Sequence, residues 1–150
     1  MSAYRYVVWG AGRQGTAAVH DLVEHCEARE VLVVEPDERR RKSASARLSR
    51  LLGKRARCLN YADQVSANDL RGMHVALSCA PYAANPGLTK LALQAQVPFT
   101  DLGGNPTVVR EQQRLASSKK IAVVPDCGVS PGLTNVIAAH CAKVHGCTNV

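Results

Sequence analysis

The sequence lacks several features that would place it at a membrane or outside the cell. No apolar run approaches the about 20 residues that a membrane-spanning helix needs. The N-terminus has no charged segment, apolar segment and small-residue cleavage site of the kind that mark a secretory signal peptide. From these absences we expect a cytoplasmic protein that has no membrane partner.

Cysteine spacing and aromatic content exclude two further classes. No C-x-x-C pair or other metal-ligand spacing occurs, so we expect no bound metal. An even number of cysteines also permits three disulfides, but without an export signal free thiols in a reducing cytosol are favoured. Aromatic residues form only 4% of the chain, and none is interleaved with the basic stretch, which argues against stacking on single-stranded nucleic acid. The six cysteines are Cys26, Cys58, Cys79, Cys127, Cys141 and Cys147.

The net charge of +7 is concentrated between Arg39 and Arg57. A basic balance is compatible with nucleic acid or another anion as partner. The same stretch also carries an apolar stripe at helical spacing, formed by Leu48, Leu51 and Leu52. We therefore interpret the charges as the solvated face of a helix and expect no nucleic-acid partner.

Short apolar runs alternate with helical patterns along the 150 residues. Apolar runs of this length are typical of buried parallel strands, and the repeated strand–helix order predicts a doubly wound, mostly parallel α/β sheet with helices on both faces. We thus expect a three-layer αβα domain over 1–150, with only a short turn in the link 60–73. The expected strands are 6–9, 31–35, 57–60, 75–79, 99–101 and 121–125, and the expected helices are 15–27, 37–52, 86–95, 108–117 and 131–144.

A glycine-rich segment joins the first expected strand to the first helix. Its spacing is G-x-G-x-x-G, the fingerprint of the Rossmann dinucleotide-binding fold. The first glycine permits a tight turn, the second allows the backbone to approach a pyrophosphate, and the third lets helix and strand pack. The helix N-terminus then presents free N–H groups and a partial positive charge to the phosphates. The segment comprises Gly10, Ala11, Gly12, Arg13, Gln14 and Gly15.

Glu35 stands twenty residues after Gly15, at the end of the second expected strand. A carboxylate there accepts hydrogen bonds from the adenosine ribose and repels a 2′-phosphate. The sequence therefore predicts NAD as cofactor, with NADP less favoured. Arg39 and Arg40 are the alternative, because they would attract a 2′-phosphate if they turned toward it.

The fourth expected strand ends at Cys79, and Ala80 and Pro81 form the turn that follows it. Ligands of open parallel sheets bind beyond the carboxyl ends of the strands. Small residues at this place leave room for the nicotinamide half of the cofactor. The next residue, Tyr82, either covers the nicotinamide ring or only caps the loop.

Two further loops at carboxyl strand ends combine carboxylates with glycines. The first reads D-L-G-G-N from Asp101, and the second reads P-D-C-G-V-S-P-G-L with Asp126 and Cys127 near its start. Glycines there allow close backbone approach to a ligand. In these two runs the sequence resembles the saccharopine dehydrogenase-like family, and most closely its lysine 6-dehydrogenase branch.

The resemblance implies an oxidoreductase that acts on a C–N bond of an amino acid with a nicotinamide cofactor. It implies that residues 1–150 are the cofactor domain and that a C-terminal substrate domain follows. Asp101, Asp126 and Cys127 are then the candidate catalytic residues, with Asp101 facing the substrate amine. As alternatives, Asp101 only caps a turn and Cys127 is only a small loop residue. We also expect the chain to form a homo-oligomer.

A non-catalytic interpretation shares part of this evidence. Regulatory domains that sense NAD in potassium channels and transporters have a similar length and the same glycine fingerprint. They do not require the D-L-G-G-N and P-D-C-G runs. We therefore favour the enzyme.

Overall fold

The computed structural model describes residues 3–146. Within this range six strands form one parallel sheet in the order β3-β2-β1-β4-β5-β6. The order reverses between β1 and β4, which opens a crevice at the carboxyl ends of these two strands. The strands are β1 (Tyr4–Trp9), β2 (Ala28–Val34), β3 (Leu59–Ala62), β4 (Val75–Ser78), β5 (Phe99–Asp101) and β6 (Val123–Val124).

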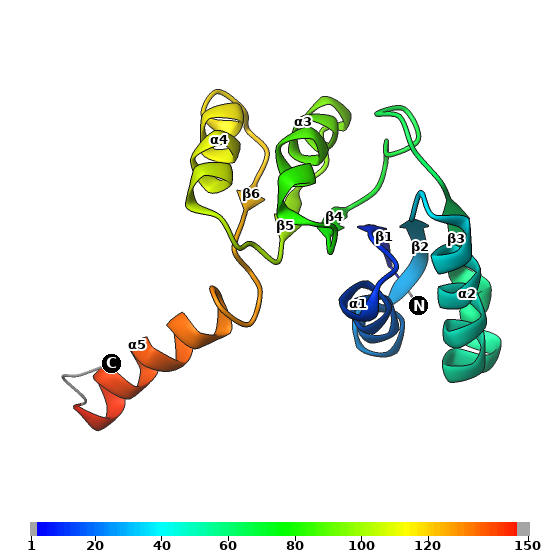
Figure 1. The fold of residues 1–150 in the computed structure, drawn as a ribbon, viewed down its shortest axis with the longest axis horizontal. Coiled ribbons are helices and arrows are strands. Elements are labelled where there is room, and N and C mark those ends of the chain that lie inside the picture. The colour runs from blue at the N-terminus through cyan, green and yellow to red at the C-terminus, as the bar shows by residue number, and fades with distance from the viewer. Residues whose placement is uncertain (1–2, 147–150) are drawn as a thin grey trace.

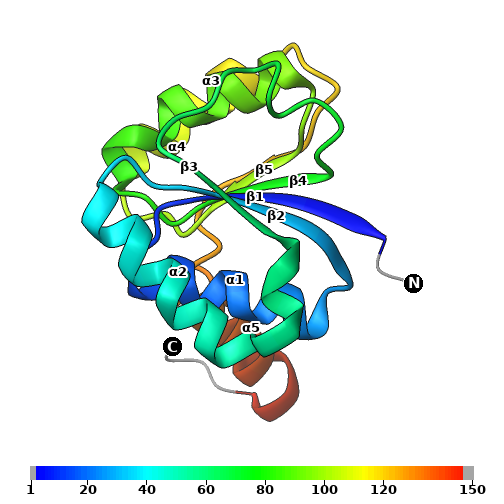
Figure 2. The same ribbon diagram turned by 90° about the vertical axis from the view of Figure 1, so that its right-hand side faces the viewer.

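Helices cover both faces of the sheet, as Figures 1 and 2 show. Two of them, α1 and α2, lie on one face, whereas α3 and α4 lie on the other (Figure 2). The predicted doubly wound, three-layer α/β architecture is thereby confirmed. The α-helices are α1 (Arg13–His25), α2 (Glu38–Leu52), α3 (Asn85–Ala95), α4 (Pro106–Ala116) and α5 (Leu133–His145), and two short 3₁₀ helices are η1 (Gly53–Cys58) and η2 (Tyr82–Ala84).

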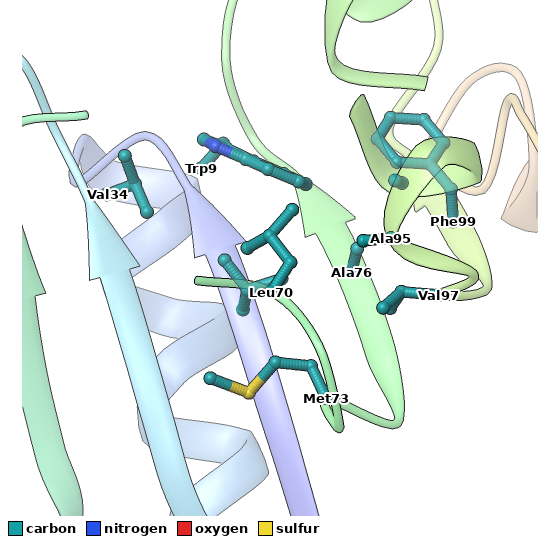
Figure 3. Packing of buried hydrophobic residues seen from close by; sticks show 10 residues of the cluster. Trp9, Val34, Leu70, Met73, Ala76, Ala95, Val97 and Phe99 are labelled. Carbon is teal, nitrogen blue, oxygen red and sulfur yellow. The ribbon is translucent and has the colours of Figure 1, made fainter. Parts of the chain in front are cut away.

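The sheet separates two apolar cores, because successive side chains of a strand point to opposite faces. In β1, Val7 and Trp9 enter the core under α3, whereas Val8 enters the core under α1 and α2. Figure 3 shows the first of these cores around Leu70 and Met73, with Phe99 contributed by β5. The second half of β1 is thus committed to packing, and its last residue is fixed where the glycine turn begins.

Local sequence signals set the ends of the helices. Asp37 caps α2 by accepting a hydrogen bond from the Arg40 amide at 2.8 Å. Asn105 caps α4 by accepting from the amides of Thr107 and Val108, at 2.9 and 3.3 Å. Such side chains satisfy backbone N–H groups that have no partner inside the helix.

The structure moves several expected boundaries, among them those of the first helix, the third strand and the sixth strand. The first helix ends at His25, because Glu27 adopts a positive φ of 50° and the strand has begun by Ala28. The third strand lies two residues later than expected, since 53–58 winds into η1. The sixth strand is reduced to Val123 and Val124. As expected, no helix forms between β3 and β4; the chain makes turns over 67–72 instead.

Helix α5 stands apart from the rest of the described chain. It follows the loop after β6 and extends away from the sheet (Figure 1). None of its residues is buried, and Val136 is 66% exposed. It ends at His145, and Gly146 caps it in the left-handed conformation.

Two absences apply to residues 3–146. None of their helices is both long and apolar enough to cross a bilayer. The five cysteines in this range form no disulfide, and Cys147 lies outside it.

Candidate functional site: a dinucleotide cleft beside two interlocked loops

The first and third glycines of the turn are required by packing within the protein. Gly10 has a φ of +91°, and a Cβ there would lie 2.9 Å from the Cys79 carbonyl oxygen. A Cβ on Gly15 would overlap the carbonyl oxygen of Gly10. Hydrogen bonds from the Gly10 amide to Val34 and from the Cys79 amide to Trp9, each of 2.8 Å, fix the turn between β2 and β4. These two glycines hold the turn close to the ends of the central strands.

Gly12 has no such internal reason to be glycine. A Cβ there would meet nothing within 4 Å, and its φ of −72° is open to any residue. It is the N-cap of α1 and offers no side-chain cap, so the first-turn N–H groups of α1 face open space. This space and these donors could hold a pyrophosphate.

Glu35 lies just beyond β2 and is 6% exposed. One carboxylate oxygen accepts the Ala11 amide at 3.0 Å, and the other accepts the Asp37 amide at 3.1 Å. The carboxylate thus ties the glycine turn to the start of α2. Each oxygen can accept a further hydrogen bond, and Glu35 lines the cleft described next.

A cavity of about 820 Å³ opens at the carboxyl ends of β1, β2 and β4. This volume suits a ligand of cofactor size. Two of the predicted cofactor residues, Ala11 and Arg13, line a second, smaller pocket instead, and Gly15 lines neither. The predicted residues that line the large cavity are Gly10, Gly12, Gln14, Glu35, Cys79, Ala80 and Pro81.

The structure adds a wall that our sequence reasoning missed. Asp63, Gln64 and Val65 follow β3, and Leu88 and Leu91 project from α3. The first three stand at a carboxyl strand end, so the rule that placed the other loops could have found them. The two leucines carried no comparable signal, because an i, i+3 apolar pair on a helix is read as core.

Cys79 contributes space rather than reactivity. Burial raises the pKa of its thiol to about 11, so the thiol stays protonated at neutral pH and is a poor nucleophile. Tyr82 is 49% exposed and lies beside Gly104 of the next loop, where an added Cβ would be 4.0 Å from its ring. Tyr82 does not line the large cavity.

Asp101 lies where no substrate reaches it, since it is 0% exposed. One oxygen accepts the amides of Gly103 at 2.8 Å and Asp126 at 3.1 Å. The other accepts the Gln112 amide group at 2.6 Å, which also donates to Thr89 at 2.9 Å. These contacts match the alternative in which Asp101 caps a turn. Its carboxylate holds the loops after β5 and β6 together.

The glycines of these two loops allow the loops to interlock, that is, to pack closely against each other. A Cβ on Gly103 would overlap the Asp126 side chain, and a Cβ on Gly128 would overlap the Leu102 carbonyl oxygen. Asp126 takes a φ of +61° and accepts the Gly104 amide at 3.2 Å. We had expected these glycines to permit the approach of a ligand; they permit the approach of one loop to the other.

Where the two loops pack together, Asp126 is half-buried and Cys127 is exposed. The Cys127 amide donates to the Asp101 carbonyl oxygen at 2.8 Å, so the backbone at this position is fixed. The three candidate catalytic residues are thus brought together. None of them lines the large cavity, which ends at the β4 loop, one strand away.

The strand order, the glycine turn and the cleft across the β1–β4 crevice define a dinucleotide-binding domain of the Rossmann type. Residues 6–124 match the family model described as "Saccharopine dehydrogenase NADP binding domain". The chain belongs to this family, which confirms the resemblance to the saccharopine dehydrogenase-like family.

Solved structures share the fold at low sequence identity. Saccharopine dehydrogenase (L-Glu forming) from Saccharomyces cerevisiae matches 95% of this chain with a TM-score of 0.73 and 18% identity. A shikimate 5-dehydrogenase from Mycobacterium fortuitum matches 98% with a TM-score of 0.66 and 18% identity. A dehydrogenase from Chromobacterium violaceum, in complex with NADH and UDP-GlcNAcA, matches 95% with a TM-score of 0.68 and 14% identity. The chain covers 32%, 52% and 40% of these proteins, respectively.

Proposed function

We propose that this chain is the cofactor domain of an oxidoreductase that acts on a C–N bond of an amino acid, in the manner of saccharopine and lysine 6-dehydrogenases. The observation that carries the proposal is the position of the interlocked loops, one strand from a dinucleotide cleft. A bound nicotinamide supplies hydride transfer there. The chain binds the cofactor, orients the substrate and excludes water from one side.

NAD is the proposed cofactor, with NADP second. The open space at Gly12 and the first turn of α1 receive the pyrophosphate. The remaining acceptor capacity of Glu35 is directed to the ribose hydroxyls, and its negative charge opposes a 2′-phosphate. Asp37 and Asp63 line the same cavity and add to this repulsion.

Among the three loop residues, Asp126 is suited to contact the substrate. Its Oδ1 accepts the Gly104 amide, whereas its other oxygen accepts no hydrogen bond within residues 3–146. We assign that oxygen to the cationic amine and the exposed Cys127 to the adjoining wall. Asp101 is a positioning residue, because it acts on the substrate only through the Asp126 backbone.

These residues form one wall of a substrate site, and we propose that a second domain supplies the other. The 150 residues alone should then bind cofactor without turnover, since hydride transfer needs the reacting carbon held within about 3.5 Å of the nicotinamide. The substrate class is tested by offering diamino acids, shikimate and inositols to the longest natural form of the protein with NAD. NADH formed from a polyol but from no amino acid would contradict the proposal.

The cofactor preference is tested with E35Q, which keeps the size of the side chain and removes its charge. We expect the ratio of NAD to NADP affinity to fall about fivefold, because one unit charge near a 2′-phosphate contributes on the order of 1 kcal/mol at a hydrated site. E38Q is the matched control, because it removes one charge in the first turn of α2, outside the cavity lining. If the ratio of NAD to NADP affinity is the same in E35Q and E38Q, Glu35 does not determine the choice between the two cofactors.

A further inference from the structure

One half of the sheet is open to water on the side where α1 and α2 lie. The strand register places Leu77 of β4, Thr100 of β5 and Val124 of β6 in one row across the sheet. Leu77 packs at the edge of the core under α1 and α2, so this row faces their side. Helix α1 packs against β1 and β2 and covers the other half (Figure 1). Leu77 and Thr100 are only half-buried, and Val124 is 52% exposed. We call this row the open shelf of the sheet.

Helix α5 carries a second uncovered apolar surface. Leu133, Ile137 and Val144 follow one another at helical spacing, so their side chains form one stripe along the helix. They are 52%, 52% and 58% exposed, and the neighbouring Val136 is 66% exposed. The helix lies on the α1 side of the sheet (Figure 2) but extends away from the shelf (Figure 1). The described chain thus leaves both a helix stripe and a sheet shelf exposed to water.

The direction of α5 is fixed where the helix begins. The Leu133 amide donates to the Gly128 carbonyl oxygen at 2.9 Å. Gly128 in turn packs so closely on Leu102 that a Cβ would overlap the Leu102 carbonyl oxygen. The Cys127 amide donates to the Asp101 carbonyl oxygen at 2.8 Å and ties the same loop to β5. Because these contacts hold the start of α5, its stripe stays away from the shelf of its own chain.

Two copies of the chain can cover both surfaces at once. With 13 residues, α5 is about 20 Å long and about 10 Å wide, so it covers a footprint of about 200 Å² on a sheet. If α5 of each copy lies on the shelf of the other, the four apposed surfaces amount to about 800 Å² of footprint, and corrugated side chains raise the accessible area toward the about 1,000 Å² that a stable interface needs. A contact between the two α5 helices alone has only about half of this footprint. The buried area therefore favours the reciprocal arrangement, which a two-fold axis closes.

We propose that this chain forms a reciprocal dimer, in which α5 of each copy docks on the open shelf of its partner. Leu133, Ile137 and Val144 of one copy then pack against Leu77 and Val124 of the other. The driving force is the removal of apolar surface from water, which needs no specific polar contact. The dimer removes together the two apolar surfaces that a single copy leaves exposed.

Val124→Lys tests the shelf, by sedimentation velocity of the whole chain over a concentration series. We expect the dissociation constant of the dimer to rise about a hundredfold or more, because each dimer would bury two unpaired ammonium groups. Lysine is common on exposed edge strands, so the variant should fold, and its circular dichroism spectrum checks this. Leu51→Lys is the matched control: Leu51 is 55% exposed on α2, outside both surfaces. This control should change the dissociation constant by less than about twofold.

Cross-linking identifies the surfaces that meet. Isotope-labelled Val124→Cys is mixed with unlabelled Ile137→Cys and treated with a short thiol cross-linker, and the linked peptides are identified by mass. A link from position 124 of a labelled chain to position 137 of an unlabelled chain supports the reciprocal dimer. Links between two copies of position 137, with Val124→Lys still dimeric, would show that the α5 helices pair with each other and would overturn the proposal. A wild type that stays monomeric would overturn it as well. Neither experiment needs cofactor or substrate, so both stand independently of the proposed function.

Discussion

Replacing Gly12 by alanine separates the function of the glycine turn from its folding. Gly12→Ala adds a Cβ that meets no protein atom within 4 Å, at a backbone conformation that alanine adopts freely. Alanine is a poorer N-cap than glycine, which costs up to about 1 kcal/mol. The loss of glycine flexibility in the unfolded chain returns about 0.4–1 kcal/mol. The free energy of unfolding without ligand should therefore stay within about 1 kcal/mol of wild type.

Cofactor binding should respond very differently. The new methyl group stands in the space assigned to the pyrophosphate and separates it from the N–H donors of α1. Losing two hydrogen bonds to a charged group costs on the order of 3 kcal/mol, which is more than a hundredfold in Kd. NAD at 100 times the wild-type Kd stabilises the wild type by about 2.7 kcal/mol, and the variant at the same concentration by about 0.4 kcal/mol.

Thermal unfolding with and without NAD measures both quantities. At about 4 °C per kcal/mol for a chain of this size, wild type should gain about 10 °C and the variant about 2 °C. Gly87→Ala is the matched control, because its Cβ also meets nothing within 4 Å and it lines neither cavity. This control should keep the full ligand shift. An equal shift in Gly12→Ala and wild type would refute a pyrophosphate at the turn.

Three further predictions concern the buried carboxylate, a buried thiol and the exposed helix. Asp101→Asn should lower the free energy of unfolding by about 2–4 kcal/mol in urea titrations, because the buried carboxylate that accepts three N–H groups is replaced by an amide that also carries donors. The control is Asp21→Asn at an exposed position, which should change the free energy of unfolding by less than about 0.5 kcal/mol. The raised pKa of Cys79, about 11, contributes stability that is fully present below pH 9 and is lost as the pH rises from 9 to 11. Cys79→Ala should flatten that decline, and an unchanged pH profile would exclude this thiol. We propose that the exposed apolar side of α5 pairs with a second copy of the chain. Ile137→Lys should then convert the dimer to a monomer in sedimentation velocity experiments. A wild-type protein that stays monomeric at high concentration would contradict this.

Much of the fold could be predicted because its signals are local. The periods of the strands and helices, the caps and the spacing Gly10 to Gly15 each depend on backbone conformation within a few residues. Glu35 was found in the same way, by its distance from the turn. The errors at the ends of α1 and at β3 arose where a 3₁₀ helix and one positive φ displaced the boundary without an apolar signal.

The roles of the loop residues depended on partners that are distant in the sequence. Asp101 and Gly103 read as ligand contacts until Asp126, more than twenty residues later, was seen to occupy the space beside them. Arg47 was interpreted as an ordinary surface charge, and only the packing of α1 against α2 brings it to one pocket with Arg13.

The sequence by itself thus determined the fold class, the glycine turn and the acid that follows it, because each of these is encoded by a short run of residues. The tertiary structure alone decided which carboxylate is buried, which glycines face another loop rather than a ligand, and which charges converge. The physical reason is that burial and electrostatic potential are sums over all neighbours in space, and those neighbours are set by the packing of whole elements.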